Sequence, residues 1–316
     1  MKIARMVALA AVLIPTPALA CASCGCTFTS DWLSQGLVTQ PGSAVSLRWD
    51  YVPQTRLRSG TETVDTTQIA LPVDYELEQR TYNSYVTLSY DRQWANDWGI
   101  NVSLPFVTRP HSTIAEGETD PSRSTGSGIG DARIVARWQG LSTPGGVTGL
   151  QFGLVLPTGG FHRTFTSGPE AGSPIDRGLQ PGTGTVQGVV GAYHYGRVGQ
   201  DFALVLQAQG QFALNDREGY RPGTVGEASA AVQFIALRGV TPELQVNFRA
   251  NARDSGVNSD RANSGGEQVY LSPGLSAKVS DRVSAFALVQ VPVYQRVNGL
   301  QLTPRVTTSA GLQARF

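Results

Sequence analysis

Apolar and polar residues alternate along residues 305–316, at the end of the chain. One set is Val306, Thr308, Ala310, Leu312, Ala314 and Phe316, and the other is Arg305, Thr307, Ser309, Gly311, Gln313 and Arg315. A period of two places the two sets on opposite faces of a β-strand. The pattern therefore predicts a strand with one face suited to lipid and one face that needs water.

The same period recurs through most of the chain. It is clearest in residues 243–251, where every apolar residue faces one way and every polar residue the other. Each segment is close to the roughly 9–11 residues that a tilted transmembrane strand needs. We predict about twelve strands, at 44–53, 81–93, 98–108, 129–138, 148–157, 182–195, 200–213, 225–237, 242–251, 267–279, 282–294 and 304–316.

The segments between the predicted strands alternate in length. Long polar segments (54–80, 109–128, 158–181, 214–224, 252–266 and 295–303) are interleaved with short ones (94–97, 139–147, 196–199, 238–241 and 280–281). Outer-membrane barrels have long external loops and short periplasmic turns. The sequence therefore predicts an all-β fold, a transmembrane antiparallel up-and-down β-barrel with both ends in the periplasm. A soluble sandwich would not sort its loops in this way, and no blade repeat supports a propeller.

The amino-terminal residues have the features of a secretory signal peptide. Lys2 and Arg5 precede an apolar run that ends at Ile14, and Ala18-Leu19-Ala20 provides a small-residue cleavage site. The run is much shorter than the ~20 apolar residues of a membrane span. We expect a signal peptide at 1–20, a periplasmic segment at 21–43 and the barrel at 44–316.

The terminal Phe316 on an alternating strand resembles the sorting signature of bacterial outer-membrane barrels. This resemblance implies the outer membrane of a Gram-negative bacterium, with lipid as a partner. Only 16% of the residues are charged, and the chain after residue 20 carries 23 basic and 24 acidic residues. We therefore expect no nucleic-acid partner, for which a basic stripe would be needed.

The polar faces of the predicted strands direct charged side chains into the barrel. The predicted pore-lining residues are Arg48, Asp50, Asp131, Arg133, Arg137, Glu227, Glu243, Arg249 and Arg305, with Lys278, Arg282 and Arg315 on the same faces. Such charges either pair with one another and close the interior, or line a mildly cationic path for small solutes. The sequence leaves open a channel or transporter and a structural or assembly barrel with a plugged lumen. Loop 158–181 carries Phe161 and Phe165, which could constrict a pore.

Two short motifs suggest a family. Gly126-Ser127-Gly128-Ile129-Gly130-Asp131-Ala132-Arg133 leads into a predicted strand, and Leu156-Pro157-Thr158-Gly159 follows later. Together they resemble the outer-membrane proteins of the meta-pathway of phenol degradation. The resemblance implies a channel for small solutes, aromatic ones among them. The glycines also suit a tight turn before a strand, whatever the family.

All three cysteines lie in Cys21-Ala22-Ser23-Cys24-Gly25-Cys26, directly after the predicted cleavage site. Three thiolates at this spacing suit one soft metal ion, copper or zinc, and would link the barrel to a periplasmic metal or redox partner. A disulfide in the oxidising periplasm and lipidation of Cys21 are the alternatives. The segment lacks the histidine that c-type haem attachment requires.

The histidines give no support for catalysis. His111 and His162 fall in predicted loops. His194 follows the outward-facing residues of the predicted strand 182–195, near the edge of the membrane. The sequence does not place a serine, a histidine and an acid on neighbouring strands, as a hydrolase would need. We expect a protein that is not an enzyme, with an outer-membrane hydrolase as the weaker alternative.

Overall fold

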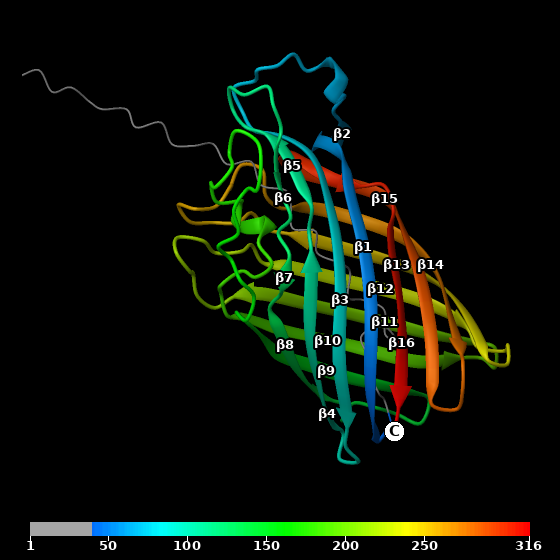
Figure 1. Cartoon of the computed structure of the whole chain (residues 1–316). Helices are drawn as coiled ribbons and strands as arrows, with labels where there is room; N and C mark the ends of the chain where they lie inside the picture. The colour runs from blue at the N-terminus through cyan, green and yellow to red at the C-terminus, as the bar shows by residue number, and fades with distance from the viewer. Residues whose placement is uncertain (1–39) are drawn as a thin grey trace, which may run out of the picture.

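The computed structural model describes residues 40–316, and the strands in this part of the chain form one antiparallel sheet that closes on itself (Figure 1). The barrel strands are β1 (Gly42–Gly60), β3 (Leu77–Gln93), β4 (Trp98–Thr108), β8 (Ala132–Trp138), β9 (Gly146–Leu156), β10 (Gln187–Val198), β11 (Phe202–Ala213), β12 (Val225–Phe234), β13 (Val240–Asn251), β14 (Gly266–Lys278), β15 (Val283–Pro304) and β16 (Thr307–Arg315). The predicted signal peptide, the three cysteines and most of the predicted periplasmic segment 21–43 lie outside the described residues.

The barrel closes at β1, which pairs with strands from both ends of the chain. Residues 42–54 of β1 pair with residues 81–93 of β3, and residues 44–51 pair with residues 308–315 of β16. From β16 the order runs back through β15 to β8, and then to β4 and β3, with antiparallel pairing throughout. Because every barrel strand has two neighbours, no backbone edge is left open. The predicted all-β barrel of twelve strands is confirmed.

The connections differ in length at the two ends of the barrel. The end with the long connections, here called the loop end, carries 61–76, 109–131, 157–186, 214–224 and 252–265. The other end, the turn end, carries the short connections, and both the start of β1 and the end of the chain lie there (Figure 1). The long connections also contain short elements: β2 (Glu62–Thr63), β5 (His111–Ile114), β6 (Ser122–Ser124), β7 (Gly128–Ile129) and the 3-10 turns η1 (Thr66–Gln68) and η2 (Arg177–Leu179).

The last hairpin differs from the prediction. Residues 295–303 were expected to form a loop, but all of them belong to β15. Residues up to Val297 pair with β14, whereas residues 300–304 pair with β1, so the chain reverses near Gly299, whose φ is +62°. Leu302 is buried in this pairing. The polar composition of the segment had suggested a loop, but its pairing with β1 keeps it in the sheet.

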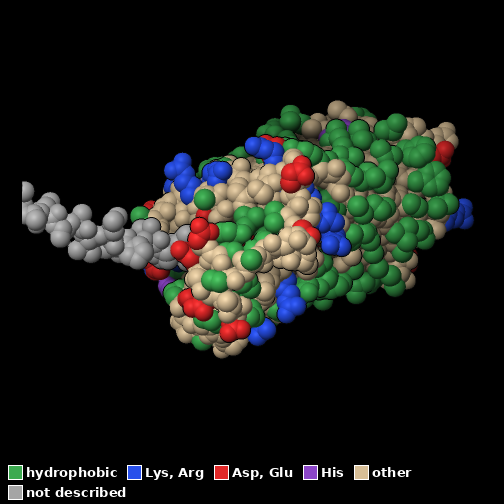
Figure 2. Space-filling model, turned by 90° about the horizontal axis from the view of Figure 1, so that it is seen from above, with side chains coloured by type: hydrophobic (Ala, Val, Ile, Leu, Met, Phe, Trp, Pro, Cys, Tyr) green, Lys and Arg blue, Asp and Glu red, His purple; other side chains and the backbone are tan. Residues whose placement is uncertain are grey.

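The outer wall of the barrel is apolar, as the alternation predicts. Leu47, Leu88, Phe106 and Leu244 are each at least half exposed, and many outward-facing residues on the other strands are similar. Figure 2 shows hydrophobic side chains covering the strand region, with acidic and basic side chains gathered over the loops. A soluble protein seldom leaves so large an apolar surface in water. No helix within residues 40–316 is long and apolar enough to cross a membrane.

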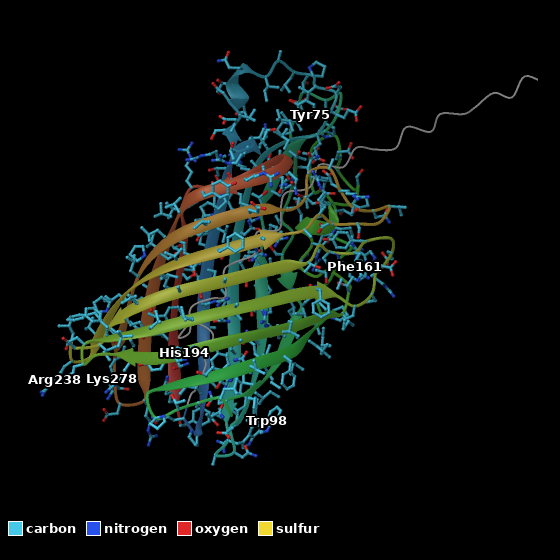
Figure 3. All side chains as sticks on the ribbon, turned by 180° about the vertical axis from the view of Figure 1, so that it is seen from behind. Tyr75, Trp98, Phe161, His194, Arg238 and Lys278 are labelled. Atoms are coloured by element: carbon cyan, nitrogen blue, oxygen red, sulfur yellow. The ribbon has the colours of Figure 1, made fainter. Side chains whose placement is uncertain are left out.

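Aromatic side chains lie at the turn end and on the outer face of the barrel. Trp98 lies at the turn end, with Arg238 and Lys278 on the other side of the same end, while Tyr75 and Phe161 lie among the loops (Figure 3). Trp49, on the outer face of β1, is 43% exposed and stacks on Tyr51 with ring centroids 5.9 Å apart. Such rings suit the interfaces of a bilayer.

Candidate functional site

A cavity of about 280 Å³ lies inside the barrel, beneath the loop end. Its wall comes from strands around the barrel, and its roof comes from connections that fold inward, mainly 157–186. The charged residues that line it are Arg48, Arg109, Asp131, Arg133, Arg177, Glu227, Arg249 and Asp254. Arginines therefore outnumber acids in the cavity, and the partners of each acid decide how much positive charge remains.

One chain of hydrogen bonds connects four of the barrel strands. Arg249 on β13 forms an ion pair with Glu227 on β12, and Gln209 on β11 donates to the same carboxylate. Gln209 in turn accepts from Arg133 on β8 at 2.7 Å. Arg133 also contacts the amide oxygen of Gln211 at 3.5 Å and forms no ion pair with a described acid. The guanidinium of Arg133 is thus held by neutral amides, which satisfy its N–H groups without cancelling its charge.

Asp131 fastens the roof to the wall. Its carboxylate accepts from the backbone N–H of Gly159 at 3.0 Å, and from both the N–H and the hydroxyl of Thr183 at 2.8 Å. Gly159 and Thr183 lie near the two ends of connection 157–186. One side chain therefore holds both stems of this connection against the start of β8.

The two motifs singled out in the sequence meet at this point. Thr158 donates to the carbonyl of Gly130 and accepts from the N–H of Ala132, both at 2.8 Å. A Cβ atom on Gly130 would lie 2.9 Å from Pro105, and one on Gly159 would lie 2.6 Å from Gly182. The glycines permit this close approach, and Asp131 supplies the acceptors. The motifs thus build the junction between wall and roof.

Arg109, at the end of β4, supports the roof from a second side. Its guanidinium donates to the carbonyls of Gly178 and Gln180 at 3.0 and 3.3 Å, and to the hydroxyl of Tyr85 at 2.7 Å. The roof also has a small core of its own, formed by Phe165, Ile175 and Leu179. Connection 157–186 is therefore a packed element rather than an open loop.

Phe161 and Phe165, which the sequence suggested could constrict a pore, do not face the cavity. Phe165 is buried in the roof's own core, and Phe161 lies 4.2 Å from the guanidinium carbon of Arg177, a cation–π geometry. Neither lines the cavity. The roof instead presents Arg177, Gln180 and Thr183 to the cavity.

The interior toward the turn end is filled by paired and apolar side chains. Arg137 on β8 forms an ion pair with Asp91 on β3, and both side chains are fully buried. Tyr193, Val205 and Ala231 form an apolar cluster on β10, β11 and β12. Here the charges are matched, and the residues pack as a protein core does.

The structure separates the predicted pore-lining residues into groups. Arg48, Asp131, Arg133, Glu227 and Arg249 line the cavity. Asp50 is buried beside Arg48, 2.7 Å away, and Arg137 belongs to the buried pair. Glu243 accepts from Gln233 and Gln245, each at 2.9 Å.

Arg305 does not line the cavity. It is exposed in a bulge between β15 and β16 and lies in a cleft on the outside of the barrel. The expectation followed strict alternation from Thr307, but Pro304 pairs with Gln54, so the bulge shifts the register. Lys278, Arg282 and Arg315 are exposed at the turn end.

Three charged cavity residues were not predicted: Arg109, Arg177 and Asp254. Arg109 follows β4, and the other two lie in connections, where no alternation marks an inward side chain. Asp254 accepts from the hydroxyl of Tyr220 at 3.0 Å and from the N–H of Gly223 at 2.7 Å. Burial raises the pKa of Asp254 above its usual range. No sequence signal marks such inward-folded loops.

The histidines have partners that do not suggest a hydrolase. His111 bonds Thr81 at 2.8 Å, His194 bonds Thr148 at 2.8 Å, and His162 lies 3.1 Å from Glu218. Burial, with Arg109 nearby, lowers the pKa of His111 to about 3. Within residues 40–316 no cluster of His, Cys, Asp and Glu has the geometry of a metal site.

Comparison with known proteins gives a fold but no family. No family model matches the chain, and no curated protein matches it in sequence. Among solved structures, the COG4313 outer membrane channel from Pseudomonas putida F1 is similar, with a TM-score of 0.62 and 11% identity, covering 88% of this chain and 96% of that one. The translocator domain of the autotransporter NalP from Neisseria meningitidis gives a TM-score of 0.50 and 10% identity, covering 88% and 89%. At such low identities the likeness is one of fold, and that fold is the bacterial outer-membrane barrel.

Proposed function

We propose that this protein is an outer-membrane channel that passes small anionic or polar solutes, with connection 157–186 as its gate. The observation that carries the proposal is the set of arginines in the cavity. Five arginines line the cavity against three acids, so the lining carries an excess of positive charge. Arg133 keeps its charge, so the cavity is electropositive and favours anions.

The outer-membrane placement also proposes an orientation for the barrel. The loop end would face the exterior and the turn end the periplasm, because outer-membrane barrels place long connections outside. A solute entering from outside would meet the roof first, then Arg133 and Arg48 in the cavity. It would then have to pass the packed region around Arg137 and Tyr193. The roof and this packed region are the two places that control passage.

Planar-bilayer recording tests the proposal. We expect discrete conductance steps and, in a KCl gradient, a reversal potential that indicates preference for Cl⁻. Arg133→Gln should shift that reversal potential toward zero. Exposed Arg238, at the turn end, is far from the cavity, so Arg238→Gln should behave as wild type. Steps without anion preference would refute the role of the arginines.

A structural barrel with a closed lumen is the second candidate. The buried Arg137–Asp91 pair and the apolar cluster at Tyr193 favour it, because they fill the interior toward the turn end. The two candidates differ in one measurement. A correctly folded, heat-modifiable barrel that gives no defined conductance steps would support a structural barrel with a closed lumen.

We further propose that the amino-terminal cysteines bind a soft metal ion, copper first and zinc second. The support is their spacing alone, since Cys21, Cys24 and Cys26 lie outside the described residues. Mass spectrometry of the mature protein, prepared without oxygen and with copper, tests the idea. A stable disulfide without metal, or a diacylglycerol adduct on Cys21, would replace it.

A further proposal concerns the class of solute. The motifs at Gly126–Arg133 and Leu156–Gly159 resemble the phenol meta-pathway family, which supports aromatic carboxylates as the first solutes to test. Liposome-swelling rates for benzoate and for acetate would show whether an aromatic ring is accepted. Faster swelling with neutral sugars than with either acid would contradict the anionic preference.

A further inference from the structure

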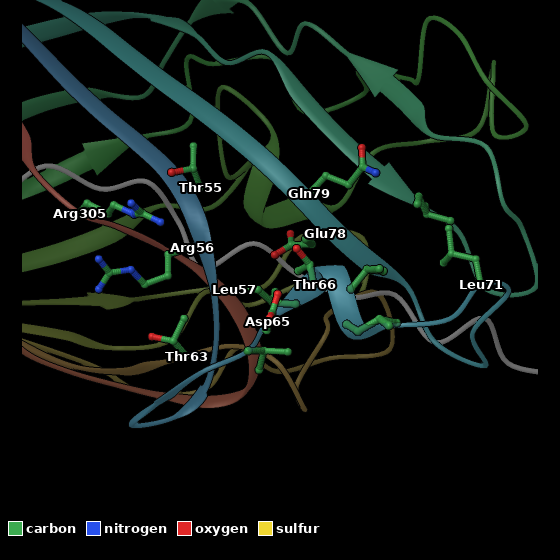
Figure 4. Close-up of a pocket in the computed structure, with 14 residues that line it drawn as sticks. Thr55, Arg56, Leu57, Thr63, Asp65, Thr66, Leu71, Glu78, Gln79 and Arg305 are labelled. Atoms are coloured by element: carbon green, nitrogen blue, oxygen red, sulfur yellow. The ribbon is translucent and has the colours of Figure 1, made fainter.

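A second cavity, of about 480 Å³, lies outside the lumen, between β1, the start of β3 and loop 61–76. Its apolar side includes Leu57, Leu77 and Ile114, which are buried together. Figure 4 shows the side chains of Arg56 and Arg305 at one end of this cleft, with Glu78 near its middle. The cleft therefore joins an apolar wall to a pair of guanidinium groups.

The cleft lies just beyond the apolar outer surface, toward the loop end. Val306 follows Arg305, precedes β16 and is 38% exposed, and Leu312 on β16 continues the apolar face below it. On β1 the stacked Trp49 and Tyr51 precede Arg56 in the direction of the loop end. Aromatic rings followed by arginines mark the level at which lipid headgroups begin.

Within residues 40–316, three charged side chains of the cleft, Arg56, Arg305 and Glu78, have hydrogen-bonding groups without a partner. Among the described residues, the side chains of Arg56 and Arg305 make no hydrogen bond or ion pair. Glu78 is only 1% exposed, and its Oε1 has no partner, while Oε2 accepts weakly from the N–H of Leu302 at 3.4 Å. A buried acceptor without a donor is costly, so a donor supplied by a bound molecule would stabilise this position.

We propose that this cleft binds a phosphorylated glycolipid of the outer leaflet. A phosphate would bind Arg56 and Arg305, an acyl chain would cover the apolar side near Leu57, and a sugar hydroxyl or amide would donate to Glu78. Arginine pairs suit phosphate oxygens through charge-assisted hydrogen bonds. The apolar wall distinguishes a lipid from free phosphate. Asp65 also lines the cleft, but its carboxylate is occupied by the N–H and hydroxyl of Thr67.

Native mass spectrometry of the purified barrel tests this proposal. The probes are bisphosphorylated lipid A, the same lipid without phosphates, and inorganic phosphate. We expect wild type to retain the bisphosphorylated lipid, and the double variant Arg56→Gln/Arg305→Gln to bind it roughly tenfold or more weakly. Arg238→Gln, at the turn end, is the matched control and should bind as wild type.

Three outcomes would overturn the proposal. Equal affinity of wild type and the double variant would exclude the two arginines. Equal affinity for the lipid without phosphates would leave a site for acyl chains only, and binding of inorganic phosphate without lipid would leave an ion site. Heat-modifiable migration confirms that the double variant is folded.

The inference rests on the outer-membrane placement under the proposed function, but the two fail separately. Because the cleft lies outside the lumen, the double variant should keep wild-type conductance while it loses the lipid. A wild-type barrel that never conducts would refute the channel and leave the lipid result intact.

Discussion

Removing the carboxylate of Asp131 should release the roof of the luminal cavity. Asp131→Ala removes the acceptor for three hydrogen bonds, from the N–H of Gly159 and from the N–H and hydroxyl of Thr183. Each such bond contributes about 1 kcal/mol net, and Asp131 is partly exposed, so water can serve some of the released donors. The loss is therefore roughly 3 kcal/mol. At 1.4 kcal/mol per factor of ten, the detached state would become about a hundredfold more populated.

Limited proteolysis measures that change. Trypsin can cleave after Arg177, which is half-buried in the roof and followed by the buried residues Gly178 and Leu179. We expect cleavage in Asp131→Ala to be faster by about the same hundredfold factor, with longer open times in planar bilayers. Asp216→Ala removes an exposed acid from another connection and is the matched control. An unchanged cleavage rate in Asp131→Ala would refute the view that this carboxylate holds the roof.

Three further predictions concern the interior and the loop end. Arg137→Ala should destabilise the barrel by about 3–5 kcal/mol in urea unfolding, because it leaves the buried carboxylate of Asp91 uncompensated, and Arg137→Ala/Asp91→Ala should recover part of the loss. Arg133→Gln should keep wild-type stability within about 1 kcal/mol, because its partners are neutral amides, and a larger loss would assign it a structural role. The lowered pKa of His111, about 3 against an ordinary 6.5, means that the folded state resists protonation. The stabilisation is complete above pH 6.5 and falls by about 1.4 kcal/mol per pH unit between 6.5 and 3, so the hydrogen-exchange protection factors of β5, which compare observed with intrinsic exchange at the same pH, should fall by roughly thirtyfold from pH 7 to pH 5. His111→Gln should abolish this dependence and exposed His162→Gln should preserve it.

The sequence predicted the barrel well because a strand that separates lipid from polar groups must alternate. The predicted strand 98–108 coincides with β4, and the outward residues of 243–251 are exposed as expected. The bulge at Arg305 and the reversal at Gly299 were not predicted, because both depend on the register with β1. A one-residue shift moves a side chain to the other face, and composition does not reveal it.

The site was only partly predictable, for a different reason. Alternation identified Arg48, Arg133 and Arg249 as inward residues, and all three line the cavity. The alternation could not identify Arg109, Arg177 or Asp254, which reach the cavity because connections fold inward. That folding depends on Asp131, Thr158 and the close approach of Gly159 to Gly182. Long-range contacts of this kind leave no periodic trace.

The contrast between Arg133 and Arg137 shows where in the interior a solute can be recognised. Both were predicted to line a pore, and both lie on β8 with their side chains inside the barrel. Arg137 has a buried carboxylate as its partner, so its charge is cancelled where it stands. Arg133 has the amide oxygens of Gln209 and Gln211, which fix the direction of the guanidinium but leave its charge for another anion. Of the two arginines, only Arg133 faces the cavity beneath the roof, so its positive charge becomes accessible when the roof opens.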